Sequence, residues 1–313
     1  LRISVTDRCN LRCVYCMPPE GIAARKKHEL LSFEEIFRLS AIFVQMGISK
    51  IRITGGEPLV RRDLEQLFAM LQPLPGLETL AITTNGVLLP DKVTALRKAG
   101  LKCINISLDT LRRERFQELT LRDEWQPVMA GILAAEAACF DSLKLNVVMI
   151  KDRNADELLD FVEFVKDRRI NVRFIEYMPF RDNKWDAKGV ISFQDMKSSI
   201  EQHYRLEPIL SQPGDVAKDF HIGGHIGTVS FISSMTDSFC SSCNRLRLTA
   251  DGSLKSCLFY EPEISLRDAL RKGCSDTDLQ SIILLALQAK PEAHPPMEEL
   301  ASMSNRAMVE IGG

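Results

Sequence analysis

The sequence has no apolar run long enough to form a membrane-spanning helix. Its longest apolar stretch, Ile282 to Ala289, is far shorter than the ~20 residues that a span needs. It also has no excess of charge of one sign, because 40 Lys and Arg stand against 42 Asp and Glu for a net charge of −2. We therefore expect no membrane anchor and no nucleic-acid binding through bulk positive charge, although a local basic patch is compatible with these numbers.

Internal repeats and low-complexity segments are also missing. With 45% hydrophobic and 26% charged residues, the composition is ordinary for a globular protein and excludes a disordered, collagen-like or coiled-coil chain. A length of 313 residues fits one large domain, or one domain with an appendage. Because the chain begins at Leu1 without a Met, inside a predicted strand, we expect residues upstream, and a targeting segment is neither found nor excluded.

Short runs of β-branched residues alternate with helical patterns in the first half of the chain. Ser32-Phe-Glu-Glu35 is a capping box that predicts the start of a helix reaching about Gln45. Six strand–helix units predict a parallel sheet, and six is two short of a closed eightfold barrel, so the expected fold is α/β with a partial, open (βα)6 TIM-like barrel. The predicted strands are 1–6, 50–54, 79–84, 103–108, 143–150 and 172–178, and further helices are predicted at about 61–71, 90–99, 125–138 and 155–166.

The pattern changes near Ser192. A helix over 193–204 precedes short strand-like pieces, a cysteine-bearing loop and helices that continue to the C-terminus. We therefore predict two parts, a barrel over residues 1–190 and a C-terminal region over residues 191–313.

Apolar and polar residues alternate along the predicted strands. In the first strand, Ile3 and Val5 share one face while Arg2 and Ser4 share the other. Later strands repeat the pattern, with Arg52, Thr54, Asn105, Ser107, Asp109, Lys144 and Asn146 on the polar face. In a barrel this polar face points inward, where water or a polar ligand must fill it. An open sheet with one solvated face is the less favoured alternative, because βαβ crossovers usually cover both faces.

The nine cysteines are the unusual feature of the composition. An odd count in a large domain argues against a disulfide scaffold and favours a reducing compartment and metal ligation. Cys9, Cys13 and Cys16 supply three thiolates just after the first strand, at the active end of a parallel barrel. Three clustered cysteines predict an iron–sulfur cluster with one open iron, since a zinc site usually has two such pairs or a histidine partner.

A second triplet, Cys240, Cys243 and Cys257, has a wider final spacing. The Asp251-Gly252 pair inside it predicts a hairpin that returns Cys257 toward the other two. On the residues alone, a structural zinc with Cys274 as fourth ligand stays an alternative to an iron–sulfur cluster.

Gly55-Gly56-Glu57-Pro58 follows the second predicted strand. Paired glycines let the backbone approach a ligand and offer it amide groups. Alone the motif is compatible with a simple turn, but its place beside the cysteine loop favours a role in ligand binding. The five histidines show no metal spacing and are expected at the surface or in loops, whereas Cys103 and Cys139 are expected to be buried and structural.

The CxxxCxxC motif over residues 9–16, with Tyr15 before its third cysteine and GGEP after the next strand, resembles the radical S-adenosylmethionine enzymes. That resemblance implies a [4Fe–4S] cluster whose open iron binds the amino and carboxylate groups of S-adenosylmethionine. Reductive cleavage would then give methionine and a 5′-deoxyadenosyl radical that abstracts a hydrogen atom. Tyr15, Gly56, Ser107 and Met178 are the implied contacts to S-adenosylmethionine.

Longer motifs narrow the resemblance to one subfamily over the whole chain, the GTP 3′,8-cyclases known as molybdenum cofactor biosynthesis protein A. They are LRISVTDR from Leu1, KIRITGGEP from Lys50, NISLD from Asn105, RFIEYMP from Arg173 and CSSCNRLR from Cys240. The subfamily implies a lyase that converts GTP to 3′,8-cyclo-7,8-dihydro-GTP, the first step of molybdenum cofactor (molybdopterin) biosynthesis. It also implies that Cys240, Cys243 and Cys257 hold a second [4Fe–4S] cluster, whose open iron binds the guanine base.

The resemblance assigns further roles residue by residue. The implied GTP contacts are Arg2, Arg52, Thr83, Lys144, Arg173, Arg245, Leu246 and Arg247. Arg8, Arg12, Arg61 and Arg62 are interpreted as surface ion-pair partners. The terminal Gly312-Gly313 is expected to enter the active site and act in catalysis, because only glycine threads a narrow cavity without a Cβ clash.

Two other functions stay open at this stage. One is another radical enzyme with an auxiliary cluster, such as a peptide-modifying one. The other is an iron–sulfur or zinc protein that only binds nucleotide. Expected partners are GTP, a downstream cyclic pyranopterin monophosphate synthase and an unidentified reductant, without nucleic acid or membrane, and a homodimer is compatible. A bacterial cytoplasm and a mitochondrial matrix both fit a reducing compartment.

Overall fold

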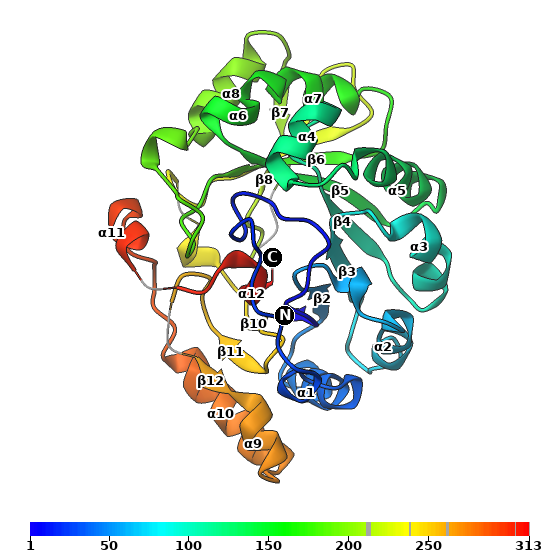
Figure 1. Ribbon diagram of the computed structural model, residues 1–313, viewed down its shortest axis with the longest axis vertical. Helices are drawn as coiled ribbons and strands as arrows, with labels where there is room; N and C mark the ends of the chain where they lie inside the picture. Colours follow the sequence, from blue (N-terminus) through cyan, green and yellow to red (C-terminus); the bar gives the residue numbers. More distant parts are fainter. Residues whose placement is uncertain (211–213, 238, 261–262, 304, 313) are drawn as a thin grey trace.

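One curved sheet organises the molecule, with helices packed on its outside (Figure 1). The computed structural model describes residues 1–210, 214–237, 239–260, 263–303 and 305–312. The strands in this part of the chain are β1 (Arg2–Ser4), β2 (Lys50–Thr54), β3 (Thr79–Thr84), β4 (Cys103–Ser107), β5 (Ser142–Met149), β6 (Asn171–Glu176), β7 (Leu206–Pro208), β8 (Lys218–Ile222), β9 (Thr228–Ile232), β10 (Arg247–Leu248), β11 (Ser253–Lys255) and β12 (Ile264–Ser265).

The sheet runs in the order β12-β11-β10-β1-β2-β3-β4-β5-β6-β9-β8-β7. Strands β1 to β6 are parallel and in chain order, and β10 and β9 extend them in parallel at the two ends. The outer strands pair in antiparallel fashion. The sheet does not close, so the predicted partial barrel is confirmed. Residues after 190 add strands to both of its ends, and a domain boundary at 190 stays a prediction.

Twelve α-helices are seen in the described part of the chain. They are α1 (Phe33–Gln45), α2 (Leu64–Leu71), α3 (Leu89–Lys98), α4 (Arg113–Thr120), α5 (Trp125–Ala137), α6 (Lys151–Asn154), α7 (Leu158–Phe164), α8 (Phe193–Glu201), α9 (Leu266–Arg271), α10 (Asp276–Gln288), α11 (Met297–Ser302) and α12 (Met308–Ile311). Helix α1 starts at the predicted capping box, in which the Glu35 amide donates to Ser32 Oγ at 3.1 Å. None of these helices has the length and apolar character to cross a membrane.

Two helix expectations differ from the structure. Helix α2 begins at Leu64 rather than near 61, because Asp63 before it has a left-handed backbone with φ 56°. Helix α4 was not predicted, because most of its residues are polar. Its buried residues are Phe116, Leu119 and Thr120.

Strand parity places the apolar side chains outside the barrel, against the helices. Ile3, Ile53, Ile104 and Leu145 have no exposed surface. The opposite face holds the polar residues that the alternation assigned to the interior, and it lines a cavity described below. The polar face of the strands therefore points into the barrel, as predicted, and does not form a solvated outer face of an open sheet.

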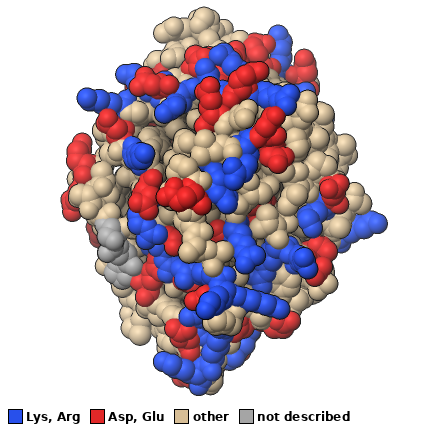
Figure 2. Space-filling view, viewed as in Figure 1, with Lys and Arg blue, Asp and Glu red and all other residues tan. Residues whose placement is uncertain are grey.

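Both described chain ends lie over the middle of the barrel (Figure 1). Figure 2 shows acidic and basic side chains interspersed over much of this face, with Lys and Arg gathered below its centre. The short helix α12 brings Gly312 beside Ser4 of β1 and Thr54 of β2. Gly313 lies outside the described residues.

Candidate active site

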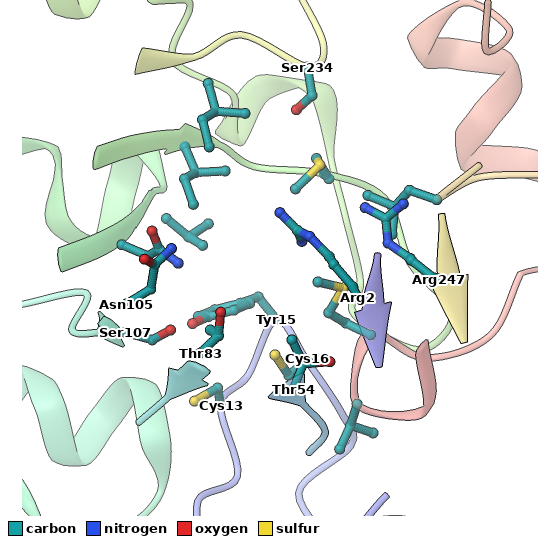
Figure 3. Close-up of a pocket in the computed structure, with 18 of the residues that line it drawn as sticks. Arg2, Cys13, Tyr15, Cys16, Thr54, Thr83, Asn105, Ser107, Ser234 and Arg247 are labelled. Atoms are coloured by element: carbon teal, nitrogen blue, oxygen red, sulfur yellow. The ribbon is translucent and has the colours of Figure 1, made fainter. Parts of the chain in front are cut away.

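A cavity inside the barrel collects both cysteine triplets. Its lining includes Cys9, Cys13, Cys16, Cys240, Cys243 and Cys257, together with Arg2, Tyr15, Gly56, Thr83, Ser107, Arg173, Met178, Arg245 and Arg247. In Figure 3, Cys13, Cys16 and Tyr15 lie on one side of the space and Ser234 on the other, while Arg2 and Arg247 reach into the region between. Residues that are more than two hundred positions apart in the sequence thus share one chamber.

The first cysteine loop is fixed by backbone hydrogen bonds to the end of helix α4. The Arg12 amide donates to the Thr120 carbonyl and the Val14 amide to the Leu119 carbonyl, both at 2.9 Å. The Leu11 amide donates to Cys9 Sγ at 3.4 Å. An unpredicted helix therefore positions the first three thiols.

Arg12 has a different role from the surface ion pair that we expected. Its guanidinium donates to the Cys9 carbonyl at 2.7 Å and to the Leu11 carbonyl at 2.8 Å. Arg61 behaves in the same way, since it donates to the carbonyls of Val5 and Leu31 at 2.7 and 2.8 Å. Both arginines stabilise the backbone around the loop, because they donate hydrogen bonds to carbonyl groups that would otherwise be unpaired.

The paired glycines are required by a close backbone crossing. A Cβ on Gly55 would lie 2.8 Å from the Thr6 carbonyl oxygen, and a Cβ on Gly56 would lie 2.5 Å from that of Arg8. The Gly56 amide donates to the Thr6 carbonyl at 2.7 Å. The Gly56 amide, which we expected to be offered to a ligand, is thus used within the protein and ties the motif to the cysteine loop.

Gly56→Ala should therefore displace the first cysteine loop. Overpacking against backbone costs about 1–3 kcal/mol, so we expect a lower melting temperature and loss of about half of the iron taken up on anaerobic reconstitution. Gly223→Ala is the matched control, because its Cβ would meet nothing closer than 3.7 Å. Full iron content and unchanged melting in Gly56→Ala would contradict this account.

Glu57 completes the same motif. It is 1% exposed and accepts from the Asn85 amide at 2.6 Å, from Thr84 Oγ1 at 2.7 Å and from the Leu59 amide at 2.9 Å. Burial raises the pKa of Glu57 to about 7, although these donors act in the other direction. The carboxyl group thus links the ends of β2 and β3, both of which carry cavity residues.

The residues assigned to S-adenosylmethionine all line the cavity that holds the first triplet. The Tyr15 hydroxyl donates to Asp109 Oδ2 at 2.6 Å, and the Val148 amide donates to Asp109 Oδ1 at 2.8 Å. Burial raises the pKa of Asp109 to about 6. The Met178 carbonyl accepts from Asn183 Nδ2 at 2.8 Å, which fixes the chain after β6.

The second triplet is carried by the predicted hairpin. Strands β10 and β11 pair in antiparallel fashion around Gly252, whose φ of 79° needs glycine, and Cys257 follows β11. Although burial acts in the other direction, hydrogen bonds from Arg245 and its positive charge lower the pKa of Cys243. Glu176 at the end of β6 accepts from the amides of Met235 and Thr236 at 2.7 and 2.9 Å, which anchors the segment leading to Cys240.

Several arginines approach each other in the barrel. Arg2 lies in register between Arg52 of β2 and Arg247 of β10. Burial and these neighbouring charges lower the pKa of Arg2, and burial together with Arg245 lowers that of Arg247 to about 9. Within the described residues, the buried Nε atoms of Arg173, Arg245 and Arg247 have no hydrogen-bond partner. Buried like charges with unused donors fit a bound polyanion.

Of the predicted site residues that the structure describes, Arg52, Lys144, Leu246 and Gly312 do not line this cavity. Arg52 donates to the Ile82 carbonyl at 2.9 Å, and burial beside Arg173 lowers the pKa of Lys144 on β5 to about 8. The Leu246 carbonyl accepts from the Arg2 amide at 2.9 Å. Gly312 lies against Ser4 and Thr54.

Sequence reasoning missed some residues of the site. His294 lies in a loop, as expected, but it also lines the cavity, with its ring nitrogens 2.7 Å from the Pro295 carbonyl and 3.0 Å from the Ser234 carbonyl. Phe239 and Phe259 also line it. None of the three belongs to a motif with recognisable spacing. Cys139, expected to be buried in a helix, is exposed just beyond α5.

The donor set fits iron–sulfur clusters. All nine cysteines are free of disulfides. Burial raises the pKa of Cys9 to about 11 and also raises those of Cys13 and Cys16, so metal binding must displace their protons. In the described part of the chain no three His, Cys, Asp or Glu side chains are grouped to hold a single ion. A [4Fe–4S] cluster does not need such a grouping, since each thiolate binds a different iron.

A partial parallel barrel with three thiols in the loop after its first strand defines the class of radical S-adenosylmethionine enzymes. In agreement, the family model of the Radical SAM superfamily matches residues 3–165, and that of Molybdenum Cofactor Synthesis C matches residues 170–296. "GTP 3′,8-cyclase, mitochondrial" of Arabidopsis thaliana is 48% identical, over 100% of this chain and 80% of its own. "GTP 3′,8-cyclase" of Moorella thermoacetica is 43% identical, over 100% and 97%. The chain belongs to the GTP 3′,8-cyclase family within this superfamily.

Other relatives are longer than this chain. "Molybdenum cofactor biosynthesis protein 1" of Homo sapiens is 47% identical over 99% of this chain but only 49% of its own length. The chain thus spans about half the length of that relative.

Solved structures agree on the fold. SuiB of Streptococcus suis aligns with a TM-score of 0.63 at 14% identity, over 97% of this chain and 74% of its own. The anSMEcpe protein with bound AdoMet aligns with a TM-score of 0.59 at 13% identity, over 96% and 80%. At such identity these neighbours support the barrel and no more.

Proposed function

We propose that this chain converts GTP to 3′,8-cyclo-7,8-dihydro-GTP in the first step of molybdenum cofactor biosynthesis. Family membership supports S-adenosylmethionine and a [4Fe–4S] cluster. We assign that cluster to Cys9, Cys13 and Cys16, and a second cluster, which holds GTP, to Cys240, Cys243 and Cys257.

One observation carries the proposal: both cysteine triplets and the buried arginines line the same cavity. A single-cluster enzyme has no need for the second triplet, and an apolar substrate would leave the guanidinium groups without partners. A nucleoside triphosphate supplies both a base for the second site and several negative charges for the arginines.

Cys9, Cys13 and Cys16 would hold the cluster that, with S-adenosylmethionine, would supply the 5′-deoxyadenosyl radical needed to abstract the 3′ hydrogen of the GTP ribose. The protein's own residues bind and orient the reactants. We assign the contacts with S-adenosylmethionine to Tyr15, Gly56, Ser107 and Met178, which line the cavity. We assign the contacts with GTP to Arg2, Thr83, Arg173, Arg245 and Arg247, which also line it. The predicted GTP contacts of Arg52, Lys144 and Leu246, which do not line it, stay predictions.

Product analysis tests the proposal directly. Anaerobically reconstituted protein given GTP, S-adenosylmethionine and a strong reductant should form 5′-deoxyadenosine and the cyclised nucleotide in equal amounts. A dependence of 5′-deoxyadenosine formation on a peptide instead of GTP would favour a peptide-modifying enzyme. Nucleotide binding without 5′-deoxyadenosine would indicate a binding protein.

Replacing the cavity arginines should weaken GTP binding and leave the fold intact. Arg245→Met and Arg247→Met each remove a charge-assisted contact worth about 1.5–3 kcal/mol, so the Kd for GTP should rise about ten- to a hundredfold. Because Arg247→Met also relieves the repulsion between the buried Arg247 and Arg245, that unliganded variant should melt no lower than wild type. Arg113→Met, in an exposed ion pair with Asp123, is the control. Unchanged GTP affinity in both cavity variants would show that the triphosphate lies elsewhere.

We extend the proposal to the cellular setting. A cyclic pyranopterin monophosphate synthase would consume the product, and a separate reductant would supply electrons. The clusters need a reducing compartment, either a bacterial cytoplasm or a mitochondrial matrix. A homodimer is compatible with the proposal, which involves no nucleic acid or membrane. Activities of the additional half of the longer relatives are not assigned to this chain.

A further inference from the structure

The segment over residues 305–312 includes α12, which lies over the middle of the barrel (Figure 1), and carries Gly312. Its only helix in the described residues, α12, is a single turn of four residues. One turn is unstable by itself, because helix nucleation costs more than a single hydrogen bond returns. Contacts with the rest of the protein must therefore determine where Gly312 lies.

The strongest contact at the start of this segment is made by Arg306. Its guanidinium lies 3.0 Å from Asp251 Oδ2, pairs with Glu263 and reaches Ser253 Oγ at 3.4 Å. The side chains are largely buried, with exposed fractions of 21% for Arg306, 9% for Asp251 and 14% for Glu263. Arg306 is thus held by a three-sided polar pocket rather than by an exposed ion pair.

This pocket belongs to the hairpin of the second cysteine triplet. Asp251 lies in the turn between β10 and β11. Glu263 also pairs with Lys255 at 3.0 Å, and Lys255 is 1% exposed and lies two residues before Cys257. Arg306 therefore attaches the tail to the segment that carries a thiol of the second triplet.

The same pocket contacts the first cysteine loop. Arg25 lies 3.0 Å from Asp251 Oδ2, and its amide donates to Asp7 Oδ2 at 2.8 Å. Beyond Arg306, Ala307 and Val309 form a small apolar cluster with Met17, which follows Cys16. Residues 306–309 thus contact residues next to both cysteine triplets.

A weaker contact lies at the other end of α12. Glu310 accepts from the Ala307 amide at 3.1 Å and pairs with Arg181 in the chain after β6. The Arg181 side chain is 48% exposed, so water and salt weaken this pair more than the Arg306 pocket.

We propose that Arg306 is a positioning residue for the cyclisation reaction, which holds the C-terminal tail in the barrel by binding the hairpin of the second cysteine triplet through Asp251 and Glu263. The inference rests on the proposed role of the tail in cyclisation. Through Arg306, the placement of Gly312 depends on the folded state of the second cluster's hairpin.

The first test uses the full chain with both clusters reconstituted. Arg306→Gln should lower kcat for the cyclised nucleotide by about tenfold or more, with KM for GTP and iron content near wild type. More 5′-deoxyadenosine per cyclised product should form, because the substrate is less well held. Arg306→Lys should recover part of the loss, and Arg181→Gln should have a smaller effect. A loss of iron or a rise in KM without a fall in kcat would overturn the proposal.

Hydrogen exchange supplies a readout that activity does not. In Arg306→Gln, the amides of Glu310 and Gly312, which donate to the Ala307 and Met308 carbonyls, should exchange faster. Arg25→Gln is a matched control, since it removes a contact of equal length to Asp251 without touching the tail, and it should leave these two amides unchanged. Unaltered tail exchange in Arg306→Gln would overturn the proposal.

A double variant separates this inference from the proposed function. A chain ending at Ile311 removes Gly312-Gly313, and adding Arg306→Gln to it should cost no further activity. If the shortened chain is inactive while Arg306→Gln keeps full turnover, the inference fails and the role of the tail stands. If the two losses multiply, Arg306 acts elsewhere and the inference fails. Full turnover by the shortened chain would reject the role of the tail, and this inference with it.

Discussion

Replacing any one of Cys9, Cys13 or Cys16 with Ala is expected to leave about half of the iron and no cleavage of S-adenosylmethionine. All three thiols lie in one loop at the cavity and have no disulfide partner. A three-thiolate site holds its cluster with no ligand to spare, so losing one thiolate should lose the cluster. Iron analysis after anaerobic reconstitution, together with quantification of 5′-deoxyadenosine, measures both effects.

The same change in the second triplet should have a different outcome. Cys240→Ala, Cys243→Ala or Cys257→Ala should also halve the iron but retain the first cluster, and GTP binding should weaken. Cys139→Ala is the control, because this thiol is exposed and does not line the cavity. One zinc and one iron–sulfur cluster in the wild-type protein would show that the second triplet is a structural zinc site.

Local sequence patterns predicted the barrel because its strands are regular and its crossovers short. The predicted strands 50–54 and 79–84 coincide with β2 and β3. Alternation along β4 and β5 placed Asn105 and Asn146 inside, and both line the cavity. Period and parity are local properties, so they can be read without knowledge of the fold.

Long-range pairing could not be predicted in the same way. Strand β10 is two residues long, and its place beside β1 depends on register with Arg2 rather than on any periodic signal. Arg12 and His294 act through backbone carbonyls, which every residue carries, so their side chains gave no motif. Tertiary packing determines such roles, and a single sequence does not display it.

The other large effect is expected at the C-terminus, where Gly312→Ala alone should suppress cyclisation. Gly312 has φ 84°, a left-handed conformation that costs an alanine about 1–2 kcal/mol. A Cβ there would also lie 2.7 Å from both Ser4 Cβ and Thr54 Oγ1, which belong to the barrel wall. Both penalties act on the docked tail, so the tail should leave the barrel while the rest of the fold is retained.

Deletion of Gly312 and Gly313 should have the same result, with cyclised product reduced by orders of magnitude. Both clusters should be retained, as should binding of GTP and S-adenosylmethionine, because none of the thiols or cavity arginines belongs to the tail. Gly273→Ala is the matched control, since its φ of 86° imposes the same backbone strain but a Cβ there meets nothing within 4 Å. That control should melt slightly lower and cyclise GTP at the wild-type rate. If Gly312→Ala behaves like Gly273→Ala, backbone strain is its only consequence and the tail has no role in the chemistry.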